Sequence, residues 1–161
     1  MKNYTHLDQN DQPGMVDVSA KAVTARSATA TVTVELGPEI TVELTELGFE
    51  TKKGSIIQTA IIAGTLAAKK TAEAIPLCHN IPLSSVKFAT TIVPEVGLRL
   101  EATAKTNANT GVEMEALHAA SVAALTVYDM CKSRSQSIRI SDLKLLQKRG
   151  GKSDYDASET P

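Results

Sequence analysis

Residues 111–132 constrain the fold most, because they predict one long helix with charged groups at both ends. Glu113 and Glu115 stand at its start, Asp129 and Lys132 stand at its end, and Ala, Val, Leu, Ser and Thr dominate the middle. A helix rises about 1.5 Å per residue, so Glu115 and Asp129 lie roughly 21 Å apart. One copy of the chain therefore cannot place both ends at one reacting centre. If both ends are functional, we expect a second copy to bring them together.

Length predicts a single domain over residues 1–161, because 161 residues can bury one core. The 17 Lys and Arg nearly balance the 18 Asp and Glu, which gives no reason to expect nucleic acid or membrane partners. Two cysteines are too few for a disulfide framework, and no signal-peptide core or membrane span is apparent. We expect a cytoplasmic protein with a polar arm over residues 1–13 and a mobile tail over 150–161.

Alternating apolar and polar residues predict the strands. Residues 29–35 alternate small or apolar side chains with Thr, and 85–93 with 98–106 form a candidate hairpin around the turn at 94–97. Within the hairpin, Leu98, Leu100, Ala102 and Ala104 are expected to face the core. Residues 137–146 supply one or two last short strands.

Two further segments predict helices. Residues 55–74 are apolar and Ala-rich, Ser55 can cap them, and Pro76 prevents much continuation. Residues 40–47 fit a strand or a short helix begun by Pro38, and we favour the helix. The order of strands and helices predicts an α+β, ferredoxin-like fold, with helices packed on one face of a mostly antiparallel sheet.

The ends of the long helix admit structural and chemical interpretations. Thr110 and Glu113 have the spacing of a capping box, a role for Glu113 as plausible as a chemical one. Glu115 also suits the positive end of the helix dipole. Asp129 and Lys132 share a helix face and form either a surface ion pair or a partly buried proton-transfer pair.

Two prolines fix a loop, residues 75–83, that carries Cys78 and His79. The pair can be buried structural residues, or metal ligands completed by His118 or Cys131, although adjacent Cys and His lack the usual zinc spacing. We favour His79 as an acid, a base or a phosphate ligand. Scattered lysines and arginines are explained singly by a solvated surface, but Lys53 precedes a helix start, where anions bind.

Five segments resemble the cyclic pyranopterin monophosphate synthases, the molybdenum cofactor biosynthesis protein C family, and the resemblance runs from about Thr5 to Ser153. These segments are 15–21 (MVDVSAK), 75–79 (IPLCH), 111–117 (GVEMEAL), 119–132 (AASVAALTVYDMCK) and 150–153 (GGKS). Asn80 departs from a proline that many relatives carry, and His118 replaces a smaller residue.

The resemblance implies a ferredoxin-like subunit in a homohexamer, a trimer of dimers. It implies that a GTP-derived cyclic triphosphate, (8S)-3′,8-cyclo-7,8-dihydroguanosine 5′-triphosphate, is converted to cyclic pyranopterin monophosphate and diphosphate, a lyase reaction. No metal or organic cofactor is expected. A separate radical enzyme makes the substrate, and we expect this enzyme to be a transient partner of the chain.

The resemblance also assigns residues. Lys132 is the principal proton-transfer group, Asp129 orients it or shares protons with it, and Lys53 is the second acid or base. The implied substrate contacts come from phosphate-binding cations, the loop pair and the start of the long helix. They are Lys21, Arg26, Lys69, Cys78, His79, Glu113, Met114, Glu115, Lys148 and Lys152.

Alanines recur every four residues along the long helix, at 116, 120 and 124 and at 119 and 123. Such ridges allow close approach of a second copy, crossing antiparallel near Val122, or of the chain's own sheet. Two other function classes stay open. A nucleotide-sensing module would need the cations without the Asp129 and Lys132 pair, and a thiolate metal protein would depend on Cys78.

Overall fold

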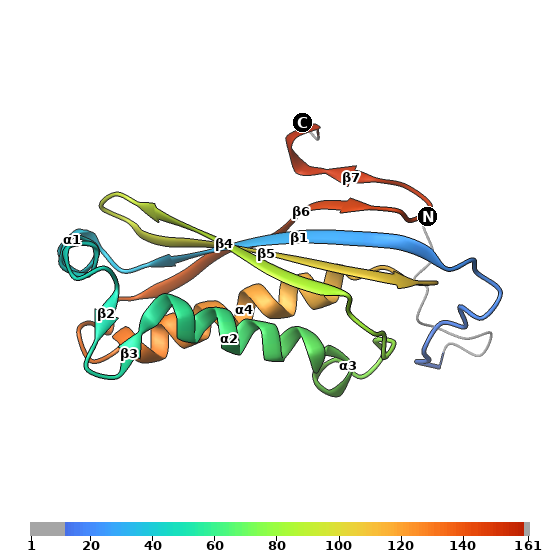
Figure 1. The fold of residues 1–161 in the computed structure, drawn as a ribbon, viewed down its shortest axis with the longest axis horizontal. Coiled ribbons are helices and arrows are strands. Elements are labelled where there is room, and N and C mark those ends of the chain that lie inside the picture. The colour runs from blue at the N-terminus through green and yellow to red at the C-terminus, as the bar shows by residue number, and fades with distance from the viewer. Residues whose placement is uncertain (1–11, 160–161) are drawn as a thin grey trace.

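The computed structural model describes residues 12–159 and has a main sheet with a helical layer on one face (Figure 1). The predicted arm, residues 1–13, therefore lies almost wholly outside the described residues. The main elements are β1 (Thr24–Glu35), α2 (Ile56–Lys69), β4 (Ser85–Val93), β5 (Gly97–Ala108), α4 (Glu113–Cys131) and β6 (Arg139–Arg149). This βαββαβ order is the ferredoxin-like one, so the predicted fold class is confirmed.

Short elements complete the chain. They are α1 (Pro38–Glu46), β2 (Glu50–Thr51), β3 (Gly54–Ser55), α3 (Thr71–Ala74), β7 (Tyr155–Asp156) and a 3₁₀ helix, η1 (Ala157–Glu159). The helix favoured for 40–47 is confirmed as α1. The predicted 55–74 helix divides at Lys70 into α2 and α3, and Ser55 caps α2 by accepting a hydrogen bond from the Gln58 amide. None of the described helices is long and apolar enough to cross a membrane.

The main sheet has the order β4-β5-β1-β6-β7, and every neighbouring pair is antiparallel. The predicted hairpin is confirmed, and its four inward residues, Leu98 to Ala104, are fully buried. β1 begins five residues earlier than predicted, pairing from Thr24 with Ala108. The last strand is one irregular element, in which Asp142 has a φ of 53° close to the register shifts against β1.

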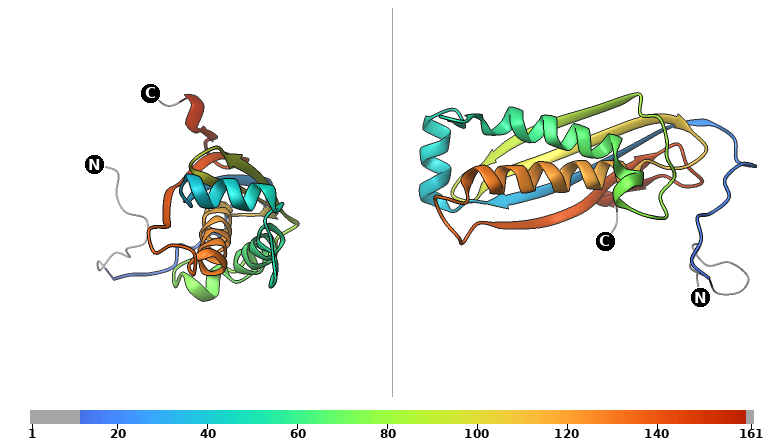
Figure 2. Two further views of the ribbon diagram at one scale, coloured as in Figure 1. Left: turned by 90° about the vertical axis from the view of Figure 1, so that its left-hand side faces the viewer. Right: turned by 90° about the horizontal axis from the view of Figure 1, so that it is seen from below.

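The helices α2 and α4 lie side by side beneath the sheet (Figure 2). All five alanines of the two ridges are 0% exposed within the single chain. The predicted crossing of two copies through these ridges is therefore wrong, because the ridges already pack inside the domain. Gly64 of α2 marks a close approach of the two helices, since a Cβ there would lie 2.7 Å from the Ala119 carbonyl oxygen.

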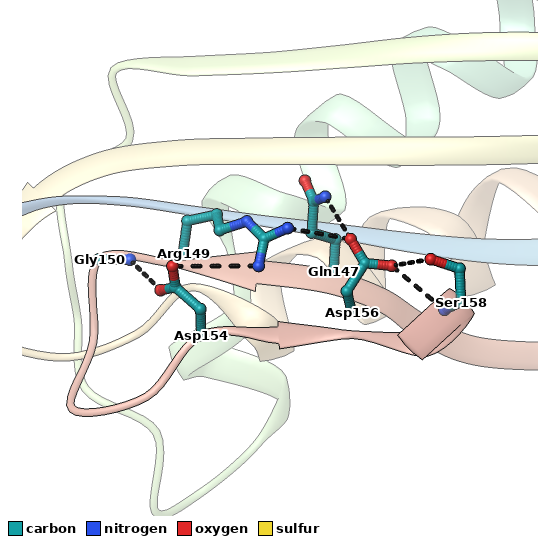
Figure 3. A network of polar contacts seen from close by, with 6 residues as sticks. All are labelled: Gln147, Arg149, Gly150, Asp154, Asp156 and Ser158. Atoms are coloured by element: carbon teal, nitrogen blue, oxygen red, sulfur yellow. Dashed lines mark hydrogen bonds and ion pairs between the residues drawn. The ribbon is translucent and has the colours of Figure 1, made fainter. Parts of the chain in front are cut away.

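The tail folds back over the sheet edge, where β7 pairs with β6 (Figure 3). The Asp156 carboxylate accepts hydrogen bonds from Gln147 Nε2 and Arg149 Nη2, both at 2.9 Å, and from Ser158. These contacts, led by Gln147, lower the pKa of Asp156 to about 2. Tyr155 and Asp156 thus attach the tail to the sheet. The mobility expected for residues 150–161 stays a prediction.

We expect Gly64→Ala to destabilise the domain by about 1–3 kcal/mol, although alanine is the better helix former. The added methyl group would lie 2.5 Å from Phe88 Cζ and 3.1 Å from Ala123 Cβ, besides the Ala119 carbonyl. The phenyl ring can move, but the backbone oxygen moves only if α4 shifts. Urea unfolding measures the effect, and Gln58→Ala on the exposed face of α2 is the control. Equal stability of Gly64→Ala and wild type would contradict this packing.

Candidate functional site

A cavity of about 310 Å³ opens at the end of the domain where α4 begins. Three segments form it: the chain before β1, the loop after α3, and the loop from β5 into the first turn of α4. The lining residues are Val16, Val18, Lys21, Leu77, Cys78, His79, Thr110, Gly111, Glu113, Met114 and Glu115. Six of the predicted site residues therefore meet here, although the sequence separates Lys21 from Glu115 by more than half of the chain.

Glu115 gives this cavity its electrostatic character. Its side chain is only 4% exposed, and burial raises the pKa of its carboxyl, with repulsion from Glu113 adding to the rise. His79 acts in the opposite direction by favouring the ionised form. Burial, followed by the nearby Glu115 charge, likewise raises the pKa of the Cys78 thiol. The cavity thus favours neutral, proton-holding forms of both groups.

His79 is tied to the wall of the cavity. Its Nε2 lies 2.7 Å from the Val16 carbonyl oxygen. A carbonyl only accepts hydrogen bonds, so Nε2 carries the proton and donates it. In the neutral ring, Nδ1 is then the nitrogen available as an acceptor.

A smaller cavity of about 90 Å³ adjoins the first, because Gly111 and Glu113 line both. Its other lining residues are Arg26, Ser27, Val112, Lys148, Arg149, Gly151 and Lys152. Three of the cations predicted to bind phosphate therefore share this cavity. Sequence reasoning missed Arg149, although it directly follows Lys148.

Two contacts orient the groups of the smaller cavity. Arg26 Nε donates to the Ala108 carbonyl oxygen at 2.9 Å, which anchors the guanidinium at the end of β5. Lys148 Nζ lies 3.2 Å from a Glu113 carboxylate oxygen, and both side chains are about one-third exposed. The predicted capping box is wrong, since Val112 is the N-cap and no side chain caps α4. Glu113 instead lies between the two cavities as the partner of Lys148.

Lys53, Asp129 and Lys132 gather at the opposite end of α4. Lys132 Nζ lies 2.6 Å from Asp129 Oδ1, and both side chains are more than 60% exposed. The hydrogen bond and the charge of Lys132 lower the pKa of Asp129, with a further contribution from Lys53, and Asp129 raises the pKa of Lys132. In a single chain the pair is therefore a solvated ion pair, and the partly buried setting that would lower the lysine pKa is absent from the described residues.

A single chain does not bring the residues that line the two cavities together with Asp129 and Lys132, because α4 has 19 residues and spans about 27 Å. Lys69 ends α2 and is exposed, and it lines neither of the two cavities.

The residues considered as metal ligands do not come together. Cys131 is buried at the far end of α4, so it cannot join Cys78 in one metal site within the chain. His118 bonds to Thr71 Oγ1 through Nδ1 at 3.2 Å. Within residues 12–159, no group of three or more His, Cys, Asp or Glu is placed to hold a metal ion.

We expect Glu115→Gln to raise the melting temperature near pH 7.5 and to leave it nearly unchanged near pH 4. The raised pKa of Glu115 means that the folded state holds a proton more tightly than the unfolded chain. Stability is therefore lost as the pH rises from the ordinary carboxyl value through the raised one, and glutamine removes that loss. Calorimetry across this pH range measures the effect, with the exposed Glu46→Gln as control. A melting temperature lowered equally at both pH values would contradict the burial cost.

The comparisons with known proteins identify the family. The model described as MoaC family matches residues 15–151. The cyclic pyranopterin monophosphate synthase of Xanthomonas axonopodis pv. citri (strain 306) is 50% identical over 155 residues, 96% of this chain and 94% of that protein. The molybdenum cofactor biosynthesis bifunctional protein of Synechocystis sp. is 51% identical, with 98% of this chain matching 46% of its length. Molybdenum cofactor biosynthesis protein 1 of Drosophila melanogaster is also 51% identical, with 28% of its length matched. Since the matches span nearly the whole chain at about half identity, this chain belongs to the MoaC family.

Proposed function

We propose that this chain is a cyclic pyranopterin monophosphate synthase, acting on (8S)-3′,8-cyclo-7,8-dihydroguanosine 5′-triphosphate and releasing diphosphate. The observation that carries the proposal is the pair of adjoining cavities, one with buried acid groups and one with cations. Relatives named cyclic pyranopterin monophosphate synthase support it at about 50% identity over nearly their full length.

The two cavities suit the two halves of this substrate. The larger one offers Glu115 and Glu113 to accept hydrogen bonds from ring N–H groups, beside the backbone of Met114. The smaller one offers Arg26, Lys148 and Lys152 to the triphosphate. Glu113 lies where the ring and the phosphates would join, so phosphate binding at Lys148 would release this carboxylate toward the ring.

The chemistry uses both kinds of group. Opening and reclosing the rings moves protons among carbon, nitrogen and oxygen, which requires placed acids and bases. In the phosphate step, a sugar hydroxyl oxygen bonds to the nearest phosphorus while the bond from that phosphorus to diphosphate breaks, and a base takes the hydroxyl proton. The cations offset the charge that develops on the phosphoryl oxygens and on the leaving diphosphate. Holding the hydroxyl in line contributes much of the remaining acceleration.

The proton-transfer pair would come from a second copy of the chain. Asp129 and Lys132 lie roughly 21 Å or more along α4 from Glu115, which lines the larger cavity of their own chain, and Lys53 lies near Asp129. A two-fold dimer would repeat the contact and complete two sites, and three dimers would give the expected homohexamer. An outer helical surface with Ile62 at 60%, Leu66 at 52% and Leu125 at 57% exposure supports an assembly larger than one chain. Enclosure beside a partner's cavity would then desolvate Lys132 and bring its pKa into a useful range. We further propose that the radical enzyme that makes the substrate is a transient partner.

We expect Lys132→Ala to lower turnover about 10²–10⁴-fold while substrate binding changes little, because the variant loses a proton-transfer group and no phosphate contact. Product formation from the cyclic triphosphate is measured by chromatography and binding by calorimetry. Lys144→Ala, another exposed lysine, is the control. Wild-type turnover in Lys132→Ala would refute the assigned role. Binding without product in the wild-type protein would instead indicate a nucleotide-sensing module.

Mixed assemblies test whether two chains share one site. We expect co-expression of Lys132→Ala with a Glu113→Gln/Glu115→Gln double variant to restore about one quarter of wild-type activity, since about half of the dimers are mixed and only one of the two sites in a mixed dimer has all its groups intact. Pairing Lys132→Ala with Asp129→Asn should restore none, because both changes lie at the same end of α4. Differently tagged chains allow the hybrids to be isolated, and native mass spectrometry checks for hexamers. No recovery in isolated hybrids of the first pair would place each site within one chain.

A further inference from the structure

We propose that Asn109 is a positioning residue, which holds residues 15–21 as the wall of the larger cavity. This inference rests on the proposed function only where it concerns substrate affinity. Residues 15–21 are called the wall segment below. They lie before β1 and adopt no helix or strand, and Val16, Val18 and Lys21 of this segment line the cavity.

The wall segment has an inner and an outer side. Val16 and Val18 are half-buried and line the cavity, whereas Asp17 and Ser19 are exposed. On the outer side, the Asp17 carboxylate accepts hydrogen bonds from the Ser19 amide at 2.8 Å and the Ser19 hydroxyl at 2.7 Å. After Val18 the segment turns, and the Lys21 amide donates to the Val18 carbonyl oxygen at 3.0 Å. Val16 and Val18 thus give the cavity an apolar wall, and Met15 is exposed.

Two side chains of the folded body donate to the backbone of the wall segment. Asn109 Nδ2 donates to the Val18 carbonyl oxygen at 3.0 Å, and His79 Nε2 donates to the Val16 carbonyl oxygen at 2.7 Å. These carbonyls are two residues apart, so the two bonds hold neighbouring points of the backbone of the wall segment. Each bond links segments far apart in the sequence, at separations of 91 and 63 residues.

Asn109 differs from His79 in what else it can touch. His79 lines the cavity and can reach a bound substrate, whereas Asn109 is not among the lining residues. Asn109 directly follows the end of β5 at Ala108, whose carbonyl anchors Arg26 of the phosphate cavity. The end of β5 therefore fixes both the cation cavity and the wall of the ring cavity. Asn109 acts through the backbone of Val18 and not on the substrate itself.

The wall segment has two consequences for the site. It brings Lys21, three residues beyond the Asn109 contact, to the cavity that also holds Glu115. Its two valines place apolar surface over this cavity, which keeps water from the buried carboxyl. Releasing the wall would therefore weaken substrate binding by removing one cation and the apolar cover. Lys132 and Asp129 at the far end of α4 would keep their geometry.

The test uses Asn109→Asp in the full-length protein. This change keeps the shape of the side chain but replaces the amide donor with a carboxylate that repels the Val18 carbonyl. We expect hydrogen exchange in residues 15–21 and tryptic cleavage after Lys21 to rise about tenfold or more, because opening the segment becomes easier. We also expect KM to rise about tenfold while kcat changes less than about threefold, since the lost contacts are binding contacts.

Asn107→Asp is the matched control, because Asn107 lies on β5, is exposed, and receives the same chemical change. It should leave exchange, cleavage and both kinetic constants at wild-type values. If Asn109→Asp folds poorly, Asn109→Ser serves as a second variant, which removes the amide without adding charge. Circular dichroism and the melting temperature establish folding for each.

The outcomes separate this inference from the proposed function. Unchanged exchange and cleavage over residues 15–21 in a folded Asn109→Asp or Asn109→Ser protein would overturn the positioning role. A fall in kcat with unchanged KM would also overturn it, since it would indicate a catalytic contact. If the wild-type protein makes no product from the cyclic triphosphate, the proposed function fails, and the exchange and cleavage measurements still decide the role of Asn109.

Discussion

Close packing of α4 against both α2 and the sheet is the constraint on which the rest of the structure depends. Five alanines of α4 are fully buried within the chain, and Gly64 lets α2 approach the backbone at Ala119. A helix packed this tightly is fixed in position, and its two ends are held apart by its own length. The carboxylates of the first turn and the Asp129 and Lys132 pair thereby become two separate chemical surfaces of one rigid element.

The two surfaces differ in how water reaches them. Glu115 is buried beside a cavity, and the cost of desolvation raises the pKa of its carboxyl. Asp129 and Lys132 are exposed, and each stabilises the charged form of the other. A carboxyl that holds its proton more tightly than usual and an ammonium that stays charged thus lie at opposite ends of α4. Under the proposed function, a site shared between two chains would bring the two kinds of group together.

Sequence patterns predicted the fold well because local periodicity and burial agree in it. The hairpin facing, the Ser55 cap and the short helix after Pro38 were all correct, since each depends on neighbouring residues. The capping box failed because the backbone places Val112 at the N-cap, and Glu113 then finds Lys148 instead. The break at Lys70 and the bulged register of β6 were missed, because packing against distant elements decides them. Arg149 lines the smaller cavity through a pairing of strands that no local pattern reveals.

The sequence by itself determined the family, the order of the elements and the separation of the charged ends, because helix rise and side-chain alternation are local properties. Tertiary structure alone decided which residues share a cavity. Lys21 and Val16 meet Glu115 only because the end of β5 and His79 hold the chain before β1 across the start of α4. The tertiary structure also decided that the alanine ridges face inward, since a ridge of small side chains fits a neighbouring helix and a second copy equally well. Contacts between residues far apart in sequence carry that information, and a single sequence does not display them.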